Sequence, residues 1–303
     1  MKQLLNLSMA AAALALAACQ SMPQGQAASQ VAKRMDVNGV SLAYTEQGRG
    51  NPVVMVHGCC SDSRAWDRHR EAIAQNHRFI ALDQRYWGTA PWPDKGEKYS
   101  PETQIEDLGA FLRGLRTGPV HLVGWSMSGA SVLGVAVRYP ELVRSVYLYE
   151  GSLGTFVTDP ADQKAIADDR GAAFGPVVPL VKAGDGAAAT RLAMDNVNAQ
   201  PGAFDSFPPA WRTMQLDNAR TLPVMFAAPP PPKITCEQLA QIKVPVAVVR
   251  GELTRPWFRI ISDTTSRCIP GSKLIVVPGA RHLWPGQEPA AFSAAVRSFL
   301  ARQ

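Results

Sequence analysis

The sequence contains no dense run of basic residues. Its 303 residues include 31 Lys or Arg and 25 Asp or Glu, which gives a formal net charge of +6 at pH 7, and the basic residues are scattered along the chain. Nucleic-acid-binding domains gather Lys and Arg on one face or along one helix. The charge pattern therefore argues against a nucleic-acid partner and indicates an ordinary solvated surface.

Two features that would indicate a cofactor are also missing. The sequence has no spaced cluster of Cys and His residues of the kind that binds metal ions, and no glycine-rich loop of the kind that binds phosphates. We therefore expect no cofactor. There is no internal repeat. With 46% apolar and only 18% charged residues, the chain can fold around an extensive core, as one large domain or two small ones.

Only one stretch is strongly apolar throughout, and it lies at the N-terminus. The segment 4–18 follows Lys2 and is too short for a comfortable membrane span, which is typical of a signal-peptide core. It ends Leu16-Ala17-Ala18-Cys19, which resembles a bacterial lipobox. We predict a lipid anchor on Cys19 in the cell envelope, with Gln20 favouring the outer membrane on its periplasmic side. The alternative is an ordinary cleaved secretion signal.

Export to an oxidising compartment makes the remaining cysteines candidates for disulfides. Cys59 and Cys60 are adjacent and would need strained geometry to bridge each other. A bond between Cys236 and Cys268 is possible, and two buried thiols are the alternative, because sequence does not give their distance.

Strand-like and helix-like segments alternate along most of the chain. After a polar tether at 19–33, an alternating stretch turns about Asn38-Gly39, a strong hairpin signal. Further strands are expected at 53–56, 79–82, 120–123, 143–149, 244–249 and 273–277, and helices at 66–75, 101–116, 237–241, 257–267 and 289–301. Continuous apolar strands separated by helices predict a mostly parallel sheet that is covered on both faces.

This alternation is interrupted between residues 151 and 232. The segment is richer in Gly, Ala, Asp and Pro and ends in four consecutive prolines. We interpret it as an insertion that caps one end of the sheet. The predicted organisation is a signal peptide at 1–18, a tether at 19–33, an α/β core formed by 34–150 and 236–303, and a small helical cap at 151–235.

Ser126 has the sequence context of a nucleophile elbow, which is a sharp turn between a strand and a helix. The apolar strand runs directly into Gly124-Trp125-Ser126-Met127-Ser128-Gly129, and a helix is expected behind it. The turn needs small residues two positions before and after the nucleophile. Gly124 meets this need, and Ser128 is small although glycine is usual there. The alternative is an ordinary serine at a helix N-cap.

Together with two other motifs, this elbow resembles the α/β-hydrolase superfamily. His57-Gly58 follows the first long strand, and Pro278-Gly279-Ala280-Arg281-His282 follows the last strand. The resemblance extends from about Val31 to the C-terminus. It implies an α/β-hydrolase fold, with a mostly parallel sheet, helices on both faces and a small inserted helical cap, and it implies a serine hydrolase.

The resemblance also implies roles for residues around the elbow. The backbone N–H groups of Cys59 and Met127 would bind the oxyanion. His282 would act as the general base that accepts the proton of Ser126. Neither Cys59 nor Cys60 lies on an elbow, which disfavours a cysteine nucleophile. The other histidines are expected to orient a loop (His57) or to be structural or solvated (His69, His77 and His121).

The acid of the triad is missing from its usual position. In most members of the superfamily it follows the next-to-last strand, and here that position is Thr254, which cannot carry a charge. Some members place the acid at the end of the strand after the nucleophile helix, where this sequence has Glu150. We therefore predict Glu150 as the acid, with Glu252, Asp263 or no acid as alternatives.

Aromatic residues gather near the expected site. The loop 86–93 should lie at the carboxyl ends of the strands, where α/β proteins bind ligands. Trp87, Trp125 and Trp284 are predicted to line the substrate pocket, and Trp211 lies in the cap. Such a pocket fits a small, hydrophobic acyl substrate. The alternative is that these side chains only pack the cap against the core.

The predicted reaction is hydrolysis of an ester-like bond in a small molecule through an acyl-enzyme. Perhydrolase or haloperoxidase, amidase, lactonase and carbon–carbon hydrolase reactions are alternatives on the same site. Haloalkane dehalogenases and epoxide hydrolases use aspartate where Ser126 stands, which disfavours both. Basic residues such as Arg255 give a weak indication of an anionic substrate group. A noncatalytic ligand-binding lipoprotein is the alternative from another class, supported by the lack of aspartate at position 254.

Overall fold

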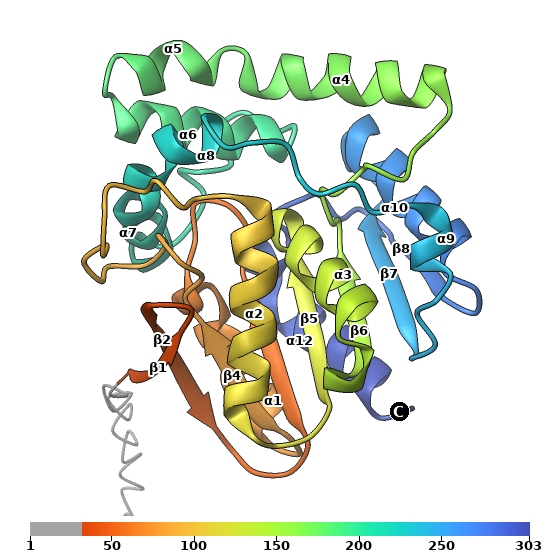
Figure 1. Ribbon diagram of the computed structural model, residues 1–303. Helices are drawn as coiled ribbons and strands as arrows, with labels where there is room; N and C mark the ends of the chain where they lie inside the picture. Colours follow the sequence, from red (N-terminus) through yellow and green to blue (C-terminus); the bar gives the residue numbers. More distant parts are fainter. Residues whose placement is uncertain (1–31) are drawn as a thin grey trace, which may run out of the picture. The chain divides into compact units, whose positions relative to one another are not determined.

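A central eight-stranded sheet organises residues 32–303, the part of the chain that this computed structural model describes (Figure 1). The strands are β1 (Lys33–Val37), β2 (Val40–Gln47), β3 (Pro52–Val56), β4 (Arg78–Leu82), β5 (Val120–Trp125), β6 (Val143–Tyr149), β7 (Val246–Gly251) and β8 (Lys273–Val277). Their order is β1-β2-β4-β3-β5-β6-β7-β8. The first two strands run antiparallel as the predicted hairpin, and the other six run parallel to one another. This topology confirms the predicted α/β-hydrolase fold.

The predicted signal peptide at 1–18, the lipidation site Cys19 and most of the predicted tether lie outside the described residues. Within residues 32–303, no helix has the length and apolar character needed to cross a membrane.

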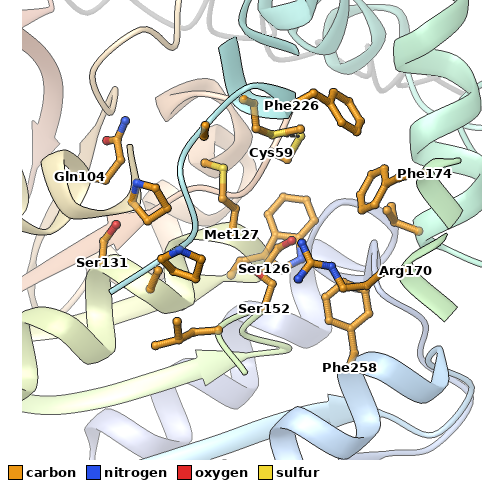
Figure 2. Close-up of a pocket in the computed structure, with 18 of the residues that line it drawn as sticks. Cys59, Gln104, Ser126, Met127, Ser131, Ser152, Arg170, Phe174, Phe226 and Phe258 are labelled. Carbon is orange, nitrogen blue, oxygen red and sulfur yellow. Dashed lines mark hydrogen bonds between the residues drawn. The ribbon is translucent and has the colours of Figure 1, made fainter. Parts of the chain in front are cut away.

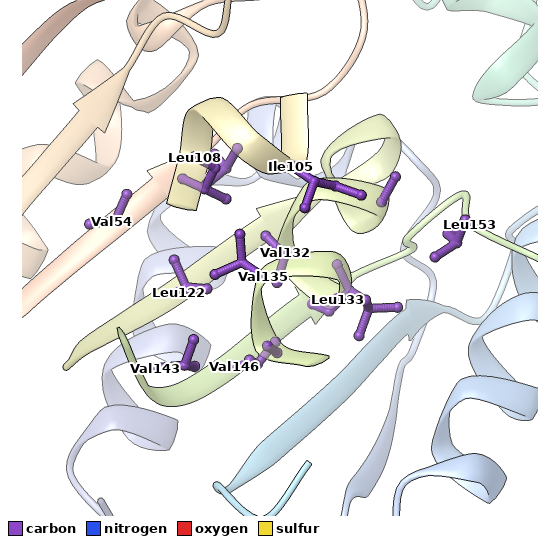
Figure 3. Packing of buried hydrophobic residues seen from close by; sticks show 14 of the residues in the cluster. Val54, Ile105, Leu108, Leu122, Val132, Leu133, Val135, Val143, Val146 and Leu153 are labelled. Carbon is purple, nitrogen blue, oxygen red and sulfur yellow. The ribbon is translucent and has the colours of Figure 1, made fainter. Parts of the chain in front are cut away.

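Different helices bury the two faces of the sheet. They are α1 (Asp67–Ala74), α2 (Pro101–Leu115), α3 (Gly129–Arg138), α9 (Cys236–Leu239), α10 (Pro256–Cys268), α11 (Trp284–Gln287) and α12 (Pro289–Leu300). Successive strand residues point to opposite faces. Val54 and Val146 pack with residues of α2 and α3 (Figure 3), whereas Val53 and Tyr147 pack on the other face with residues of α1 and α12. Because both faces are covered, the central strands β3 and β5 are buried along their whole length, whereas the edge strands β1 and β8 have exposed residues.

Local signals set the ends of several elements. The Ser100 hydroxyl accepts a hydrogen bond of 2.9 Å from the N–H of Thr103, and Pro101 occupies the first turn of α2, as predicted. The strand expected at 244–249 begins two residues later and runs to Gly251. Pro245 has no N–H to donate, which explains its place before the strand rather than inside it.

Five of the helices between β6 and β7 lie together at one end of the sheet (Figure 1). They are α4 (Pro160–Phe174), α5 (Val177–Lys182), α6 (Gly186–Val197), α7 (Pro209–Asp217) and α8 (Leu222–Phe226). They belong to the segment 151–235, which we interpret as the cap.

A disulfide joins Cys236 at the start of α9 to Cys268 at the end of α10. The sequence left this bond and two buried thiols as alternatives. Cys59 and Cys60 are free thiols in this structure.

Candidate active site

Ser126 lies on a sharp turn between β5 and α3, the short 3-10 helix η2 (Ser126–Ser128). Its φ of 61° is in the left-handed region, which is costly for a residue with a side chain. A Cβ atom added to Gly124 would lie 2.8 Å from Cγ2 of Val132, and one added to Gly58 would lie 3.0 Å from Cβ of Ser126. Close packing around the turn therefore favours glycine at both positions and leaves no room for a side chain at Gly124 unless Val132 shifts.

Ser128 replaces the glycine that is usual after such a nucleophile. Its buried hydroxyl accepts a hydrogen bond of 2.8 Å from the N–H of Trp125 and donates one of 2.9 Å to the carbonyl oxygen of Val56. The side chain therefore ties the turn to β3 and fits the elbow without opening it.

A continuous chain of hydrogen bonds connects Ser126, His282 and Glu150. The Nε2 atom of His282 lies 2.9 Å from Oγ of Ser126, and its Nδ1 atom lies 2.7 Å from Oε2 of Glu150. The second carboxylate oxygen of Glu150 accepts a hydrogen bond of 2.7 Å from the N–H of Gly251. Because a carboxylate only accepts hydrogen bonds, Nδ1 carries the imidazole proton and Nε2 is free to accept the serine proton.

Several contacts fix the loop that carries His282. Its carbonyl oxygen accepts a hydrogen bond of 3.0 Å from Nε1 of Trp125, and the N–H of Leu283 donates one of 2.8 Å to Oδ1 of Asn198. The imidazole stacks on the ring of Phe258 with 3.9 Å between the ring centroids. These contacts hold the imidazole between the serine and the glutamate.

The other candidate acids are engaged elsewhere. Glu252 is exposed and accepts a hydrogen bond from the N–H of Gly279, and Asp263 forms a 2.7 Å ion pair with Arg250. Thr254, at the usual acid position, has a buried hydroxyl without a hydrogen-bond partner among the described residues. Glu150 is the one of these acids that contacts His282.

Three other histidines, His57, His69 and His121, are buried and have structural contacts. The Nε2 atom of His57 accepts a hydrogen bond from the N–H of Gln84, so its Nδ1–H donates to the carbonyl oxygen of Gly58. This contact pattern fits the expected loop-orienting role. Although α1 lies at the surface, His69 faces inward and contacts Oγ of Ser293 at 2.9 Å. Burial lowers the pKa of His57 to about 4 and that of His69 to about 3.

A cavity of about 340 Å³ opens above the elbow (Figure 2). Ser126 and His282 line it, together with Cys59, Met127 and Trp125. The residues that we predict to donate the oxyanion N–H groups thus lie in the same cavity as the serine. In residues 32–303, no group of three or more His, Cys, Asp or Glu side chains is arranged to hold a metal ion.

Two of the three tryptophans predicted to line the pocket lie outside this cavity. Trp87 is buried against the rings of His57 and Tyr99, and Trp284 packs on Tyr149 and Phe292. The cap residue Trp211 stacks on Phe207. These side chains therefore pack the structure together, which corrects the assignment of Trp87 and Trp284. No residue of the loop 86–93 lines the cavity, although we expected this loop at the substrate site.

The prediction for Arg255 also needs correction. Its guanidinium forms a 2.6 Å ion pair with Asp169 and donates to the carbonyl oxygen of Asn196, so its charge is neutralised within the protein. The cavity instead contains Arg170, Phe174 and Phe258, together with prolines from the end of the cap segment. No sequence motif marked Arg170, because it lies on a helix of mixed charge where most side chains face solvent.

The parallel sheet, the strained serine turn and the histidine from a distant loop define an enzyme of the hydrolase class. The sequence matches the family model "Alpha/beta hydrolase family" over residues 53–295, so the chain belongs to the α/β-hydrolase family.

Known relatives and solved structures agree with this family. The 2-(acetamidomethylene)succinate hydrolase of Mesorhizobium japonicum is 24% identical over 89% of this chain and 95% of its own length. The 2-hydroxy-6-oxo-6-(2'-aminophenyl)hexa-2,4-dienoic acid hydrolase of Metapseudomonas resinovorans is 34% identical, but over only 45% of this chain and 47% of that protein. A carboxylesterase structure from Bacillus subtilis has a TM-score of 0.69 at 18% identity, covering 90% of this chain and 86% of that one.

Proposed function

We propose that this protein is a serine hydrolase that cleaves an ester-like bond of a small, largely hydrophobic substrate. Ser126 is the nucleophile, His282 the general base and Glu150 the acid of the triad. The observation that carries the proposal is the hydrogen-bond chain from Glu150 through His282 to Ser126, which ends in the cavity.

In the proposed mechanism, Oγ of Ser126 attacks the carbonyl carbon while its proton moves to Nε2 of His282. Glu150 stabilises the imidazolium that forms. The backbone N–H groups of Cys59 and Met127 donate to the developing oxyanion, and one such donor contributes about 2.7–4 kcal/mol to lowering the barrier. His282 then gives the proton to the leaving group, and a water molecule repeats the sequence on the acyl-enzyme.

The shape and lining of the cavity support the proposed substrate class. Its walls are mainly apolar side chains, such as Phe174, Met194 and Phe258, and its volume is about 340 Å³. Pockets of this kind bind small ligands mostly through apolar contact, with a few polar groups that fix orientation. We assign residues 151–235 to a cap that covers this cavity.

Reaction with a fluorophosphonate probe tests the proposal. The purified, folded protein should gain the mass of one phosphonyl group, whereas the Ser126→Ala variant should not. The same preparation should hydrolyse short 4-nitrophenyl esters, and Ser126→Ala should lose this activity. A folded wild-type protein that neither reacts with the probe nor hydrolyses any ester would show that Ser126 is not activated and would favour a noncatalytic binding protein.

We also propose that Cys19 carries a lipid that anchors the protein in the bacterial cell envelope, at the periplasmic side of the outer membrane. The lipobox supports this proposal, and so does the Cys236–Cys268 disulfide, because such bonds persist in oxidising compartments. In cells that make the protein, a clickable palmitate analogue should label the wild type and not Cys19→Ser. Labelling of both would refute the assignment.

A further inference from the structure

One charged side chain faces the cavity. Among the residues that line it, Arg170 carries a permanent positive charge, and none of the lining residues is an aspartate or a glutamate. Arg170 lies on α4, and its guanidinium points into the cavity that contains Ser126 (Figure 2). The Trp257 ring lies 5.4 Å from the guanidinium carbon, a distance typical of a cation–π contact.

The carboxylates near Arg170 are paired with other residues. Asp169, its neighbour in sequence, is held by Arg255 at 2.6 Å and by the N–H of Trp257 at 3.2 Å. Asp168 forms an ion pair with Lys164 on the surface of the same helix. Across the described residues, no hydrogen bond or ion pair forms at the guanidinium of Arg170. Its charge therefore has no internal counter-ion.

The unpaired charge of Arg170 at the cavity is energetically unfavourable in the absence of a ligand. The Arg170 side chain is exposed and reaches the cavity, and the protein atoms beside it remove enough water to lower its pKa below the ordinary value. A charge that has lost part of its hydration and has no partner is unfavourable. Charged groups with a shifted pKa and no partner inside the protein occur preferentially at functional sites.

We propose that Arg170 binds a carboxylate of the substrate, so that the enzyme prefers ester-like substrates with an anionic group separated from the reacting carbonyl by an apolar segment. This inference rests on the proposed serine hydrolase function. A guanidinium offers paired N–H donors that match the two oxygens of a carboxylate. One permanent cation in a mainly apolar cavity balances one negative charge, which favours a carboxylate over a dianionic phosphate.

Two pairs of substrates test the proposal, each pair differing only in charge. The acyl side is tested with mono-4-nitrophenyl adipate and the corresponding 4-nitrophenyl adipamate, in which the free acid is replaced by a neutral amide. The alcohol side is tested with 4-carboxyphenyl acetate and 4-carbamoylphenyl acetate. The measured quantity is the ratio of kcat/KM for the acid to that for the amide, in wild type, Arg170→Gln, Arg170→Lys and Lys164→Gln.

In at least one pair, Arg170→Gln should lower this ratio by about 10- to 100-fold, the range expected for losing a hydrogen bond to a charged group. Arg170→Lys should retain part of the preference because it keeps the charge. Lys164→Gln removes a charge from the exposed side of the same helix and should leave the ratio unchanged. Ratios within twofold of wild type in Arg170→Gln for both pairs, or an equal fall in Lys164→Gln, would overturn the proposal.

Equilibrium binding separates this proposal from the proposed catalytic function. Trp125 and Trp257 line the cavity, so their fluorescence reports on its occupant. Hexanoate should bind more tightly than hexanamide to wild type and lose this advantage in Arg170→Gln, with thermal unfolding as the check on folding. If no ester is hydrolysed but this preference is present, the catalytic proposal fails and the carboxylate site stands. Equal binding of both ligands by wild type would refute the site.

Discussion

At the scale of single residues, the position of Glu150 explains how the acid of the proposed triad can come from a different strand. In the sheet, β6 lies between β5, which leads to Ser126, and β7, which leads to the usual acid position. A glutamate at the end of β6 therefore starts beside the elbow and reaches Nδ1 of His282. Its φ of 46° is unusual for a residue with a side chain and turns the chain sharply after the strand. The N–H of Gly251 holds its other oxygen.

We predict that Glu150→Gln lowers kcat by about 10³- to 10⁴-fold, as expected when the imidazole is held in the wrong tautomer. The side-chain oxygen of the new glutamine can still accept from Gly251, so its NH₂ group faces Nδ1 of His282. Nδ1 must then accept a hydrogen bond, which moves the imidazole proton to Nε2 and prevents it from accepting the proton of Ser126. Steady-state hydrolysis of a 4-nitrophenyl ester measures the effect.

Glu252→Gln is the matched control, because it makes the same chemical change on an exposed side chain that accepts a hydrogen bond from Gly279 in the loop before His282. Its kcat should stay within about twofold of wild type, as expected for a surface substitution. A large loss in Glu252→Gln together with normal turnover in Glu150→Gln would assign the acid to Glu252 instead.

At the scale of elements, the hydrophobic pattern was enough to predict a mostly parallel sheet and the order in which most strands and helices of the core follow one another along the chain. The central strands are largely apolar because both faces of the sheet are covered, and the elbow follows β5 directly in sequence. Ser126, His282 and Glu150 could be proposed because each directly follows a strand or lies in the loop after one. Parallel strands bring such loops to the same edge of the sheet.

The lining of the cavity could not be predicted in this way. Phe174 and Arg170 reach it only because α4 lies over the carboxyl ends of the strands, and that placement depends on tertiary packing rather than on a local pattern. Conversely, Trp87 and Trp284 flank the elements of the site in sequence but turn away into aromatic clusters. Position in the sequence therefore predicted the groups that we propose to react better than it predicted the residues that line the cavity.

At the scale of the whole molecule, buried polar contacts connect the cap segment to the core. The amide of Asn218 donates to Asp62 at 2.7 Å and accepts from the N–H of Gly88 at 2.7 Å. Arg64 bridges Asp62 to Asp217 with two ion pairs. These contacts join residues far apart in sequence, and removing one partner would leave buried polar groups unpaired. Because several of these contacts involve charged side chains, we expect the free energy of unfolding to depend on pH.

We predict that the free energy of unfolding decreases as the pH falls from about 6.5 to 4. Burial lowers the pKa of His57 to about 4 and that of His69 to about 3, so over this range the unfolded chain binds protons that the folded protein excludes. Asp83 opposes them, because burial raises its pKa to about 6 and the folded protein then binds a proton that the unfolded chain releases. His57 and His69 against Asp83 leave a net loss of about 1.4 kcal/mol per pH unit, and His121, whose pKa burial lowers to about 4, adds to this loss. Urea unfolding between pH 4 and 7.5 measures this slope.

Two single substitutions separate the opposing groups. His69→Gln removes a site that only the unfolded chain protonates, so it should flatten the slope even if it lowers stability at every pH. Asp83→Asn keeps an oxygen that can accept the 2.8 Å hydrogen bond from the N–H of Ser63 but removes the opposing proton, so it should steepen the slope between pH 4 and 6. Stability that rises on acidification in the wild type, or identical slopes in all three proteins, would contradict the assignment. Slopes that move in opposite directions would show that burial of these ionisable side chains, rather than net charge, sets the acid limit of the fold.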